Sequence, residues 1–164
     1  MSQRRETNRV LRIGPLETVH EHKVIHRDIK PGNLLITNEG NLKIADFGIS
    51  LMFATGQTMT IKSGRGTTAF MAPEIFESFY ANNAGYNGKR ADIWSMGVTL
   101  FRMWNGKMPF QVSQGTNSPI YQCRADFKDG RPELLKALLD RMLEQDPAKR
   151  ITMNQLRVSL SPGS

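Results

Sequence analysis

Residues 26–33, with the sequence HRDIKPGN, carry side chains whose types and spacing suit a reaction at phosphate. The carboxylate of Asp28 can accept or orient the proton of an attacking hydroxyl, and Lys30 can place an ammonium beside the moving phosphate. Asn33 offers an amide oxygen and Asp46 a carboxylate, and both are oxygen ligands that suit Mg²⁺. These residue types point to transfer of a phosphoryl group from a nucleotide–magnesium complex.

Three motifs follow one another along the chain: HRDIKPGN at 26–33, DFG at 46–48 and APE at 72–74. Their order resembles the catalytic loop, the metal-binding motif and the activation-segment anchor of eukaryotic-type serine/threonine protein kinases. Chance agreement of the matching letters is on the order of 10⁻¹³ at average residue frequencies. Residues 68–74 and 97–100 bear a weaker resemblance to calcium/calmodulin-dependent kinase kinases.

The resemblance implies a role for each matching residue, with ATP and Mg²⁺ as cofactors and a protein Ser or Thr hydroxyl as the acceptor. Asp28 and Lys30 would be catalytic, and Leu35 would lie under the adenine ring. Asn33 and Asp46 would hold the nucleotide's metal. Structural or regulatory roles fall on a larger set: His26, Arg27, Phe47, Gly48, Ser63, Thr67, Glu74, Asp92 and Arg150.

Several of these roles have simpler alternatives. Asp92 resembles the buried aspartate that holds the catalytic-loop backbone, although an Asp before a helix is commonly an N-cap. Glu74 and Arg150 resemble an ion pair that anchors the activation segment. His26 and Phe47 match two members of a hydrophobic stack, and ordinary core packing would also explain them.

Two further features concern specificity and regulation. Lys30 before Pro31, together with Thr67, resembles serine/threonine rather than tyrosine kinases. Arg27 would bind a phosphate on Ser63 added by an upstream activating kinase, which would order the loop. Thr58 and Thr60 are alternative phosphosites. The simpler interpretation is that the loop is polar and carries no phosphate.

The elements that position these residues can be read from their patterns. We expect a helix over 16–22, a strand at 24–25, and a hairpin of strands 34–36 and 42–45 around a turn at 37–41. Residues 49–70 predict a long polar loop. The apolar residues of 89–105 cover every face of a helix, which predicts a buried helix ended by Gly106.

Two amphipathic helices are expected to close the chain. In 132–143, six apolar residues form one stripe, and Pro132 suits the first turn: Leu134, Leu135, Leu138, Leu139, Met142 and Leu143. Thr152 and Gln155 predict a capping box at the start of the last helix.

Composition excludes several other classes. The net charge of +7 comes from scattered Lys and Arg, which argues against a nucleic-acid partner. The lone Cys123 excludes an internal disulfide, and neither a secretory signal nor a membrane-spanning stretch is expected. His20, His22 and His26 do not have zinc-site spacing, and the GxGxxA of 64–69 lacks the strand and helix of a dinucleotide site. We expect a cytoplasmic protein without a membrane partner, with the nucleus as the alternative location.

These 164 residues contain no GxGxxGxV before His26 and no VAIK-like strand lysine. The expected fold is therefore mainly α with a small β hairpin region, a kinase-like C-terminal lobe without the N-terminal β lobe. The expected divisions are a loose segment at 1–16, a partial kinase domain at 17–160 and a tail at 161–164. The expected function is a serine/threonine kinase in intracellular signalling. The alternative is a truncated, inactive kinase lobe that acts as a protein-binding module.

Overall fold

The computed structural model describes residues 14–54, 60–61, 64–80, 85–111, 122–123 and 133–161. The α-helices are α2 (Gly14–Glu21), α3 (Pro73–Tyr80), α4 (Gly88–Asn105), α5 (Glu133–Met142) and α6 (Met153–Leu160), and the 3₁₀ turns are η1 (Pro31–Asn33) and η2 (Thr68–Phe70). The strands pair two by two, all antiparallel: β1 (Val24–Ile25) with β4 (Leu51–Met52), β2 (Leu34–Ile36) with β3 (Leu42–Ile44), β5 (Thr60–Ile61) with β6 (Tyr86–Asn87), and β7 (Phe110–Gln111) with β8 (Gln122–Cys123).

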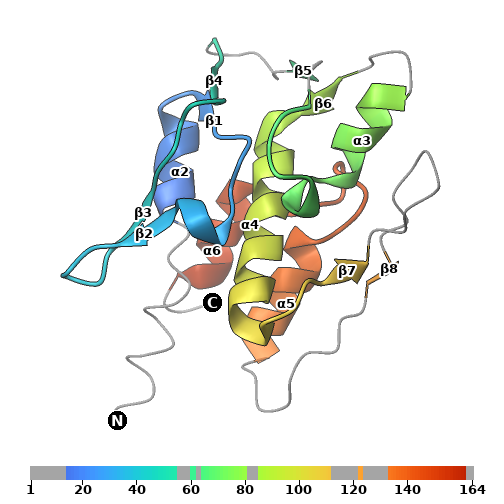
Figure 1. Cartoon of the computed structure of the whole chain (residues 1–164). Coiled ribbons are helices and arrows are strands. Elements are labelled where there is room, and N and C mark those ends of the chain that lie inside the picture. Colours follow the sequence, from blue (N-terminus) through green and yellow to red (C-terminus); the bar gives the residue numbers. More distant parts are fainter. Residues whose placement is uncertain are drawn as a thin grey trace.

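Helix α4 is the central element, and Figure 1 shows the other helices arranged around it. Residues 91–99 are all buried, as the sequence predicts. The side chain of Asn87 accepts a hydrogen bond from the Arg90 amide and begins the helix, and Gly106 ends it in the left-handed conformation at φ 72°. The predicted burial is wrong for the last turn, where Met103 is 54% exposed.

The core lies on several sides of α4. Trp94 and Val98 pack with β1, η2 and β7 in one cluster, and Ile93 and Met96 pack with α2, α5 and α6 in another. A Cβ at Gly97 would lie 3.0 Å from the Met142 Cβ, so a glycine lets α4 and α5 approach closely. Helix α4 therefore joins the two core clusters, because it contributes buried side chains to both.

Several predictions need correction. The predicted β2–β3 hairpin is confirmed. The prediction of one long loop over 49–70 is wrong, because this stretch contains β4, β5 and η2. Gly14 and Pro15, placed in a loose segment, begin α2, because proline is tolerated in a first helical turn. Leu134 is 52% exposed and does not belong to the buried stripe of α5. The predictions for residues 1–13, Pro132 and 162–164 lie outside the described residues.

Among the residues that the structure describes, no helix has both the length and the apolar character needed to span a bilayer.

The predicted capping box at the start of α6 is confirmed. The Thr152 hydroxyl accepts a hydrogen bond from the Gln155 amide at 3.1 Å, and the Gln155 side chain accepts one from the Thr152 amide at 2.9 Å. Each bond satisfies an amide that a helix start otherwise leaves without an intrahelical partner.

We expect Thr152→Ala to lower the free energy of unfolding by about 1 kcal/mol, because it removes one cap acceptor. Urea unfolding followed by circular dichroism measures the change. Thr152→Ser keeps the hydroxyl and should stay close to the wild type. An equal loss in both variants would contradict a role for the capping bond.

Candidate active site

A buried carboxylate on α4 holds the backbone of the 26–33 loop. Asp92, 1% exposed, accepts hydrogen bonds from the backbone amides of His26 and Arg27, each at 2.9 Å. The His20 Nε2 of α2 lies 2.9 Å from the same carboxylate. Arg27 has a φ of 73°, a left-handed conformation that an Arg seldom adopts. The N-cap alternative for Asp92 is wrong, since Asn87 caps α4 and Asp92 lies inside the helix.

The His26 ring connects the loop to the DFG segment. Its Nδ1 accepts a hydrogen bond from the Asp28 amide at 3.2 Å, so its Nε2 carries the proton that is donated to the Ala45 carbonyl at 3.0 Å. The ring also meets Phe47 edge-on, with ring centroids 4.9 Å apart. His26 is fully buried, whereas Phe47 is 45% exposed. The structure thus brings these two predicted stack members together.

Asp28 sits at the centre of a hydrogen-bonded group. Its Oδ1 accepts from the Thr67 amide at 2.9 Å and from the Thr67 hydroxyl at 2.7 Å. Its Oδ2 accepts from Lys30 Nζ at 2.7 Å and from Asn33 Nδ2 at 3.3 Å. Burial alone would raise the pKa of Asp28, but the hydrogen bonds from Lys30 and Thr67 outweigh it and lower that pKa below its usual value. The carboxylate is therefore ionised at neutral pH.

Lys30 bridges the two segments of the site. Its Nζ donates to the Thr67 hydroxyl at 2.9 Å as well as to Asp28. Gly66, at φ 126°, makes this approach geometrically feasible, since a Cβ there would lie 2.3 Å from the Arg27 carbonyl oxygen. Gly66 and Thr67, just before η2, therefore contact the 26–33 loop directly.

Asn33, which contacts Asp28, and Asp46 can each supply an oxygen ligand to a metal ion. Asn33 is 6% exposed, and its amide nitrogen donates to the Asp28 carbonyl at 2.8 Å, which leaves its amide oxygen without a hydrogen bond among the described residues. The Ala45 amide donates to the Asn33 carbonyl at 2.9 Å and holds the start of the DFG segment there. Asp46, at φ 63°, is exposed and accepts from the Gly48 amide at 3.3 Å. An amide oxygen and a carboxylate fit a hard cation such as Mg²⁺.

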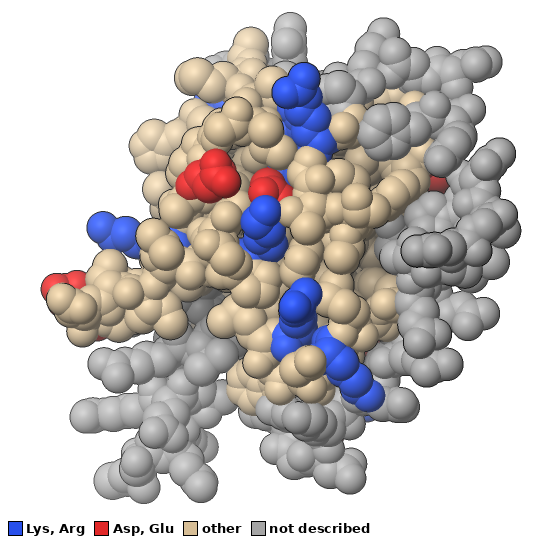
Figure 2. All heavy atoms as spheres, viewed as in Figure 1, with Lys and Arg blue, Asp and Glu red and all other residues tan. Residues whose placement is uncertain are grey.

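Figure 2 shows acidic side chains near the middle of one face, with a basic side chain beside them and the other basic groups scattered. Leu35, predicted to lie under an adenine ring, is on β2 and 53% exposed. Ile36 and Met52 are also exposed, at 70% and 77%. An apolar surface of this kind is characteristic of a region that another molecule or domain covers.

The predicted ion pair between Glu74 and Arg150 is present and buried. Two parallel hydrogen bonds, of 2.6 and 2.9 Å, join the guanidinium to the carboxylate. Arg150, 1% exposed, also donates to the carbonyls of Arg90 and Glu144, and stacks 4.9 Å from the Trp94 ring. The start of α3 is thereby fixed to the segment before α6.

Arg27 has more neighbours than the sequence suggests. Its Nη1 donates to the Ile49 carbonyl at 3.3 Å, and its side chain hydrogen-bonds Tyr86. Burial raises the pKa of the Tyr86 hydroxyl, while Arg27 acts in the opposite direction. Ser63 and Thr58, the phosphosite candidates on the loop, lie outside the described residues, and nothing is described of the Thr60 side chain.

Sequence reasoning missed three supporting residues. Sequence reasoning assigns His20 no role once a zinc site is rejected, but its side chain is 4% exposed and bonds Asp92. Its place beside Val19 on the buried face of α2 was the available signal. Gly66 and Ser95, which donates to the Phe70 carbonyl at 2.8 Å, gave no signal because their contacts are long-range.

Comparison with known proteins gives consistent matches. Residues 7–159 match the family described as protein kinase domain. The chain is 42% identical over 146 residues to the calcium/calmodulin-dependent protein kinase kinase cmkC of Emericella nidulans, covering 87% of this chain and 27% of that protein. It is 41% identical over 155 residues to the serine/threonine-protein kinase stk11 of Xenopus laevis, covering 88% and 33%. It is 40% identical over 151 residues to the CBL-interacting serine/threonine-protein kinase 10 of Arabidopsis thaliana, covering 90% and 30%. The chain thus spans about a third of the length of these relatives.

We expect Glu74→Ala to lower the free energy of unfolding by about 3–5 kcal/mol, because it leaves the buried Arg150 guanidinium without its carboxylate. Chemical unfolding measures this loss. Glu77→Ala, on the exposed side of the same helix, removes the same charge and should change stability by no more than about 0.5 kcal/mol. Similar losses in the two variants would show that the ion pair is not responsible.

We expect Thr67→Val to raise the pKa of Asp28 toward its ordinary value, because the hydroxyl that donates to Oδ1 is removed. A titration of the Asp28 carboxyl carbon by NMR measures the shift. Since the folded pKa is depressed, the stability that Asp28 provides is present above its unfolded pKa of about 4. That stability is lost as the pH falls through the lower folded value. Thr68→Val, at the neighbouring exposed position, should leave the titration unchanged.

Proposed function

The chain belongs to the protein kinase family, and we propose that it forms the C-terminal lobe of a serine/threonine kinase that transfers the γ-phosphoryl group of ATP to a protein hydroxyl. The observation that carries this proposal is the hydrogen bonding of Asp28. Lys30 donates to one oxygen of its carboxylate and Thr67 donates to the other. A carboxylate held in this way presents a fixed, charged acceptor to an incoming hydroxyl.

The ionised state of Asp28 defines its contribution. Its lowered pKa makes it a weak base toward a free alcohol, so its first effect is to orient the hydroxyl for attack. The proton moves to the carboxylate as the hydroxyl oxygen bonds to the γ-phosphorus and the bond from that phosphorus to the leaving ADP oxygen breaks. Lys30, already 2.7 Å from that carboxylate, supplies a positive charge where negative charge develops on the phosphate oxygens.

The metal side of the proposed site rests on Asn33 and Asp46. Their amide oxygen and carboxylate would hold Mg²⁺, which when bound offsets the charge of the nucleotide phosphates. Asn33 contributes a further effect through its amide nitrogen, which donates to the Asp28 backbone and side chain. One residue thereby links the position of the base to the position of the metal ligands.

The exposed apolar side chains of Leu35, Ile36, Phe47 and Met52 support the assignment to a C-terminal lobe. In the kinase family a nucleotide-binding lobe covers this region, and these 164 residues contain neither its glycine-rich motif nor its strand lysine. The same apolar surface also favours a second candidate function, in which the chain binds a protein partner without catalysis. The retained Asp28, Lys30, Asn33 and Asp46 are unexpected for that alternative.

Regulation by phosphorylation is part of the proposal. Arg27 is held at the junction of the 26–33 loop and β6, where it bonds Ile49 and Tyr86. A phosphate on Ser63 would add a strong acceptor for its guanidinium. An upstream kinase would then order the loop by charge-assisted hydrogen bonds.

A chimera tests the catalytic proposal. The chain replaces the matching segment of the Emericella nidulans relative, which is 27% of that protein. The rest of the relative would have to supply the glycine-rich motif and the strand lysine of a kinase. We expect ATP-dependent phosphorylation of Ser and Thr, but not Tyr, in a generic protein substrate, measured by phosphoamino-acid analysis. Asp28→Asn should reduce the rate about 10²–10⁴-fold, because the base is lost.

Asp140→Asn provides the matched control, since it removes the same charge from the exposed face of α5 and should keep the rate. Unchanged activity in Asp28→Asn would refute the assigned base. A folded chimera without activity would instead favour the protein-binding alternative.

A further inference from the structure

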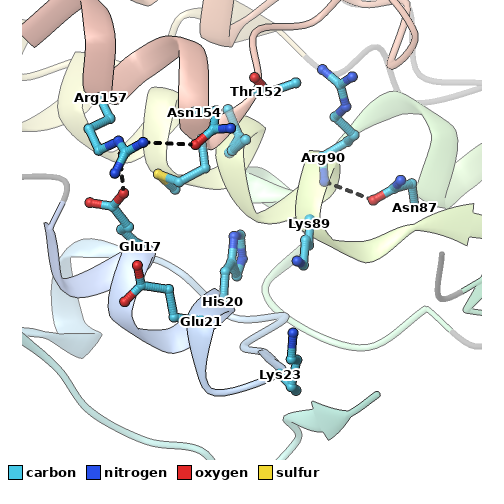
Figure 3. A pocket seen from close by; sticks show the side chains of 12 residues that line it. Glu17, His20, Glu21, Lys23, Asn87, Lys89, Arg90, Thr152, Asn154 and Arg157 are labelled. Carbon is cyan, nitrogen blue, oxygen red and sulfur yellow. Dashed lines mark hydrogen bonds and ion pairs between the residues drawn. The ribbon is translucent and has the colours of Figure 1, made fainter. Parts of the chain in front are cut away.

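A polar cavity of about 430 Å³ lies away from the 26–33 loop, between α2 and the starts of α4 and α6. Figure 3 shows Glu17 and Glu21 at one end of it, Lys23 and Lys89 at the other, and His20 between them. The proposed catalytic residues do not line this cavity. Its chemistry therefore needs a separate explanation.

The basic end of the cavity has uncompensated positive charge. Lys23 and Lys89 have no carboxylate partner among the described residues, although Lys89 lies 4.6 Å from the Phe53 ring. Burial lowers the pKa of Lys89, and the charge of Lys23 lowers it further. An anion between the two ammonium groups would relieve this repulsion.

The acidic end is partly neutralised. Glu17 pairs with Arg157 at 3.7 Å, and Arg157 also donates to Asn154 at 3.4 Å, as Figure 3 shows. Glu21 is exposed at the end of α2. The cations that line the cavity, Lys23, Lys89, Arg90 and Arg157, outnumber the carboxylates of Glu17 and Glu21, so its net charge is positive.

Two helices begin at this cavity. Asn87 and Lys89 come from the start of α4, and Thr152 and Asn154 come from the start of α6. Neither helix has an acidic residue in its first turn. Helix starts carry partial positive charge, and cations such as Lys89 beside one are unfavourable unless an anion is near.

His20 adds a buried polar atom that points to a ligand. Its ring is 4% exposed and its Nε2 lies 2.9 Å from the Asp92 carboxyl group, while its Nδ1 has no hydrogen-bond partner among the described residues. The His20 side chain extends from α2 into the lining of the cavity (Figure 3). A phosphate group can both donate and accept, so it can pair with Nδ1 in either protonation state of the ring.

We propose that this cavity binds a phosphate group, held by Lys23 and Lys89, by the starts of α4 and α6, and by the free nitrogen of His20. The phosphate is either a free anion or part of a phosphorylated side chain. Its binding would also reach the proposed catalytic loop, because His20 bonds the carboxylate that holds the His26 and Arg27 amides.

Inorganic phosphate is the first probe, added to the complete 164-residue chain at constant ionic strength with chloride as the balancing salt. We expect phosphate to raise the unfolding temperature and to shift the NMR signals of the His20 ring and of the His26 and Arg27 amides. Lys89→Gln should weaken phosphate binding about tenfold or more, because it removes a charged hydrogen-bond donor.

Lys107→Gln is the matched control, since it removes the same charge beyond the opposite end of α4 and should leave binding unchanged. Lys23→Gln gives a second site variant and should weaken binding like Lys89→Gln. Tighter binding of O-phosphoserine than of phosphate would identify a phosphorylated side chain as the ligand, and equal binding would identify the free anion. The proposal fails if phosphate acts no differently from chloride, or if the site variants bind it like Lys107→Gln.

Discussion

The proposed active site depends on one buried carboxylate. A polar group that is 1% exposed is costly to bury unless hydrogen-bond partners surround it, and Asp92 has three: the amides of His26 and Arg27 and the ring of His20. These bonds come from two separate segments and converge on the N-terminal part of α4. They hold Arg27 at a positive φ, and that backbone turn directs the next side chain, Asp28, toward the segment before η2.

Two further connections make the arrangement specific rather than merely stable. The Glu74–Arg150 pair fixes the end of the 64–74 segment, and the bonds of Thr67 to Asp28 fix its middle. A bidentate ion pair permits little angular variation, and the close approach at Gly66 permits little translation. The 64–74 segment is thus positioned at two points. At one of them, the Thr67 hydroxyl also accepts a hydrogen bond from Lys30, which bonds the Asp28 carboxylate as well.

Sequence reasoning succeeded where the signal was local. The β2–β3 hairpin, the buried helix α4 with Gly106 at its end, and the Thr152–Gln155 capping box each depend on residues close together in the chain. The strand at 24–25 is confirmed as β1, but its partner β4 and the ladder β5–β6 were missed, because two residues per strand carry no readable alternation and pairing joins distant segments. The family motifs brought Asp28 and Thr67 into one hypothesis, but their contact joins residues far apart in sequence, and only the fold gives its geometry.

The two sides of the site are held to different degrees, and this difference has a physical consequence. Asp28 has donors on both oxygens, so its position is fixed before any substrate arrives. Asp46 is exposed, and the bond described for its side chain is the local one from Gly48; Phe47 beside it is 45% exposed. Preorganisation needs support from surrounding groups. The proposed base, Asp28, is therefore fixed by the described fold itself, whereas precise placement of the proposed metal ligand, Asp46, depends on whatever covers the apolar surface around Leu35 and Phe47.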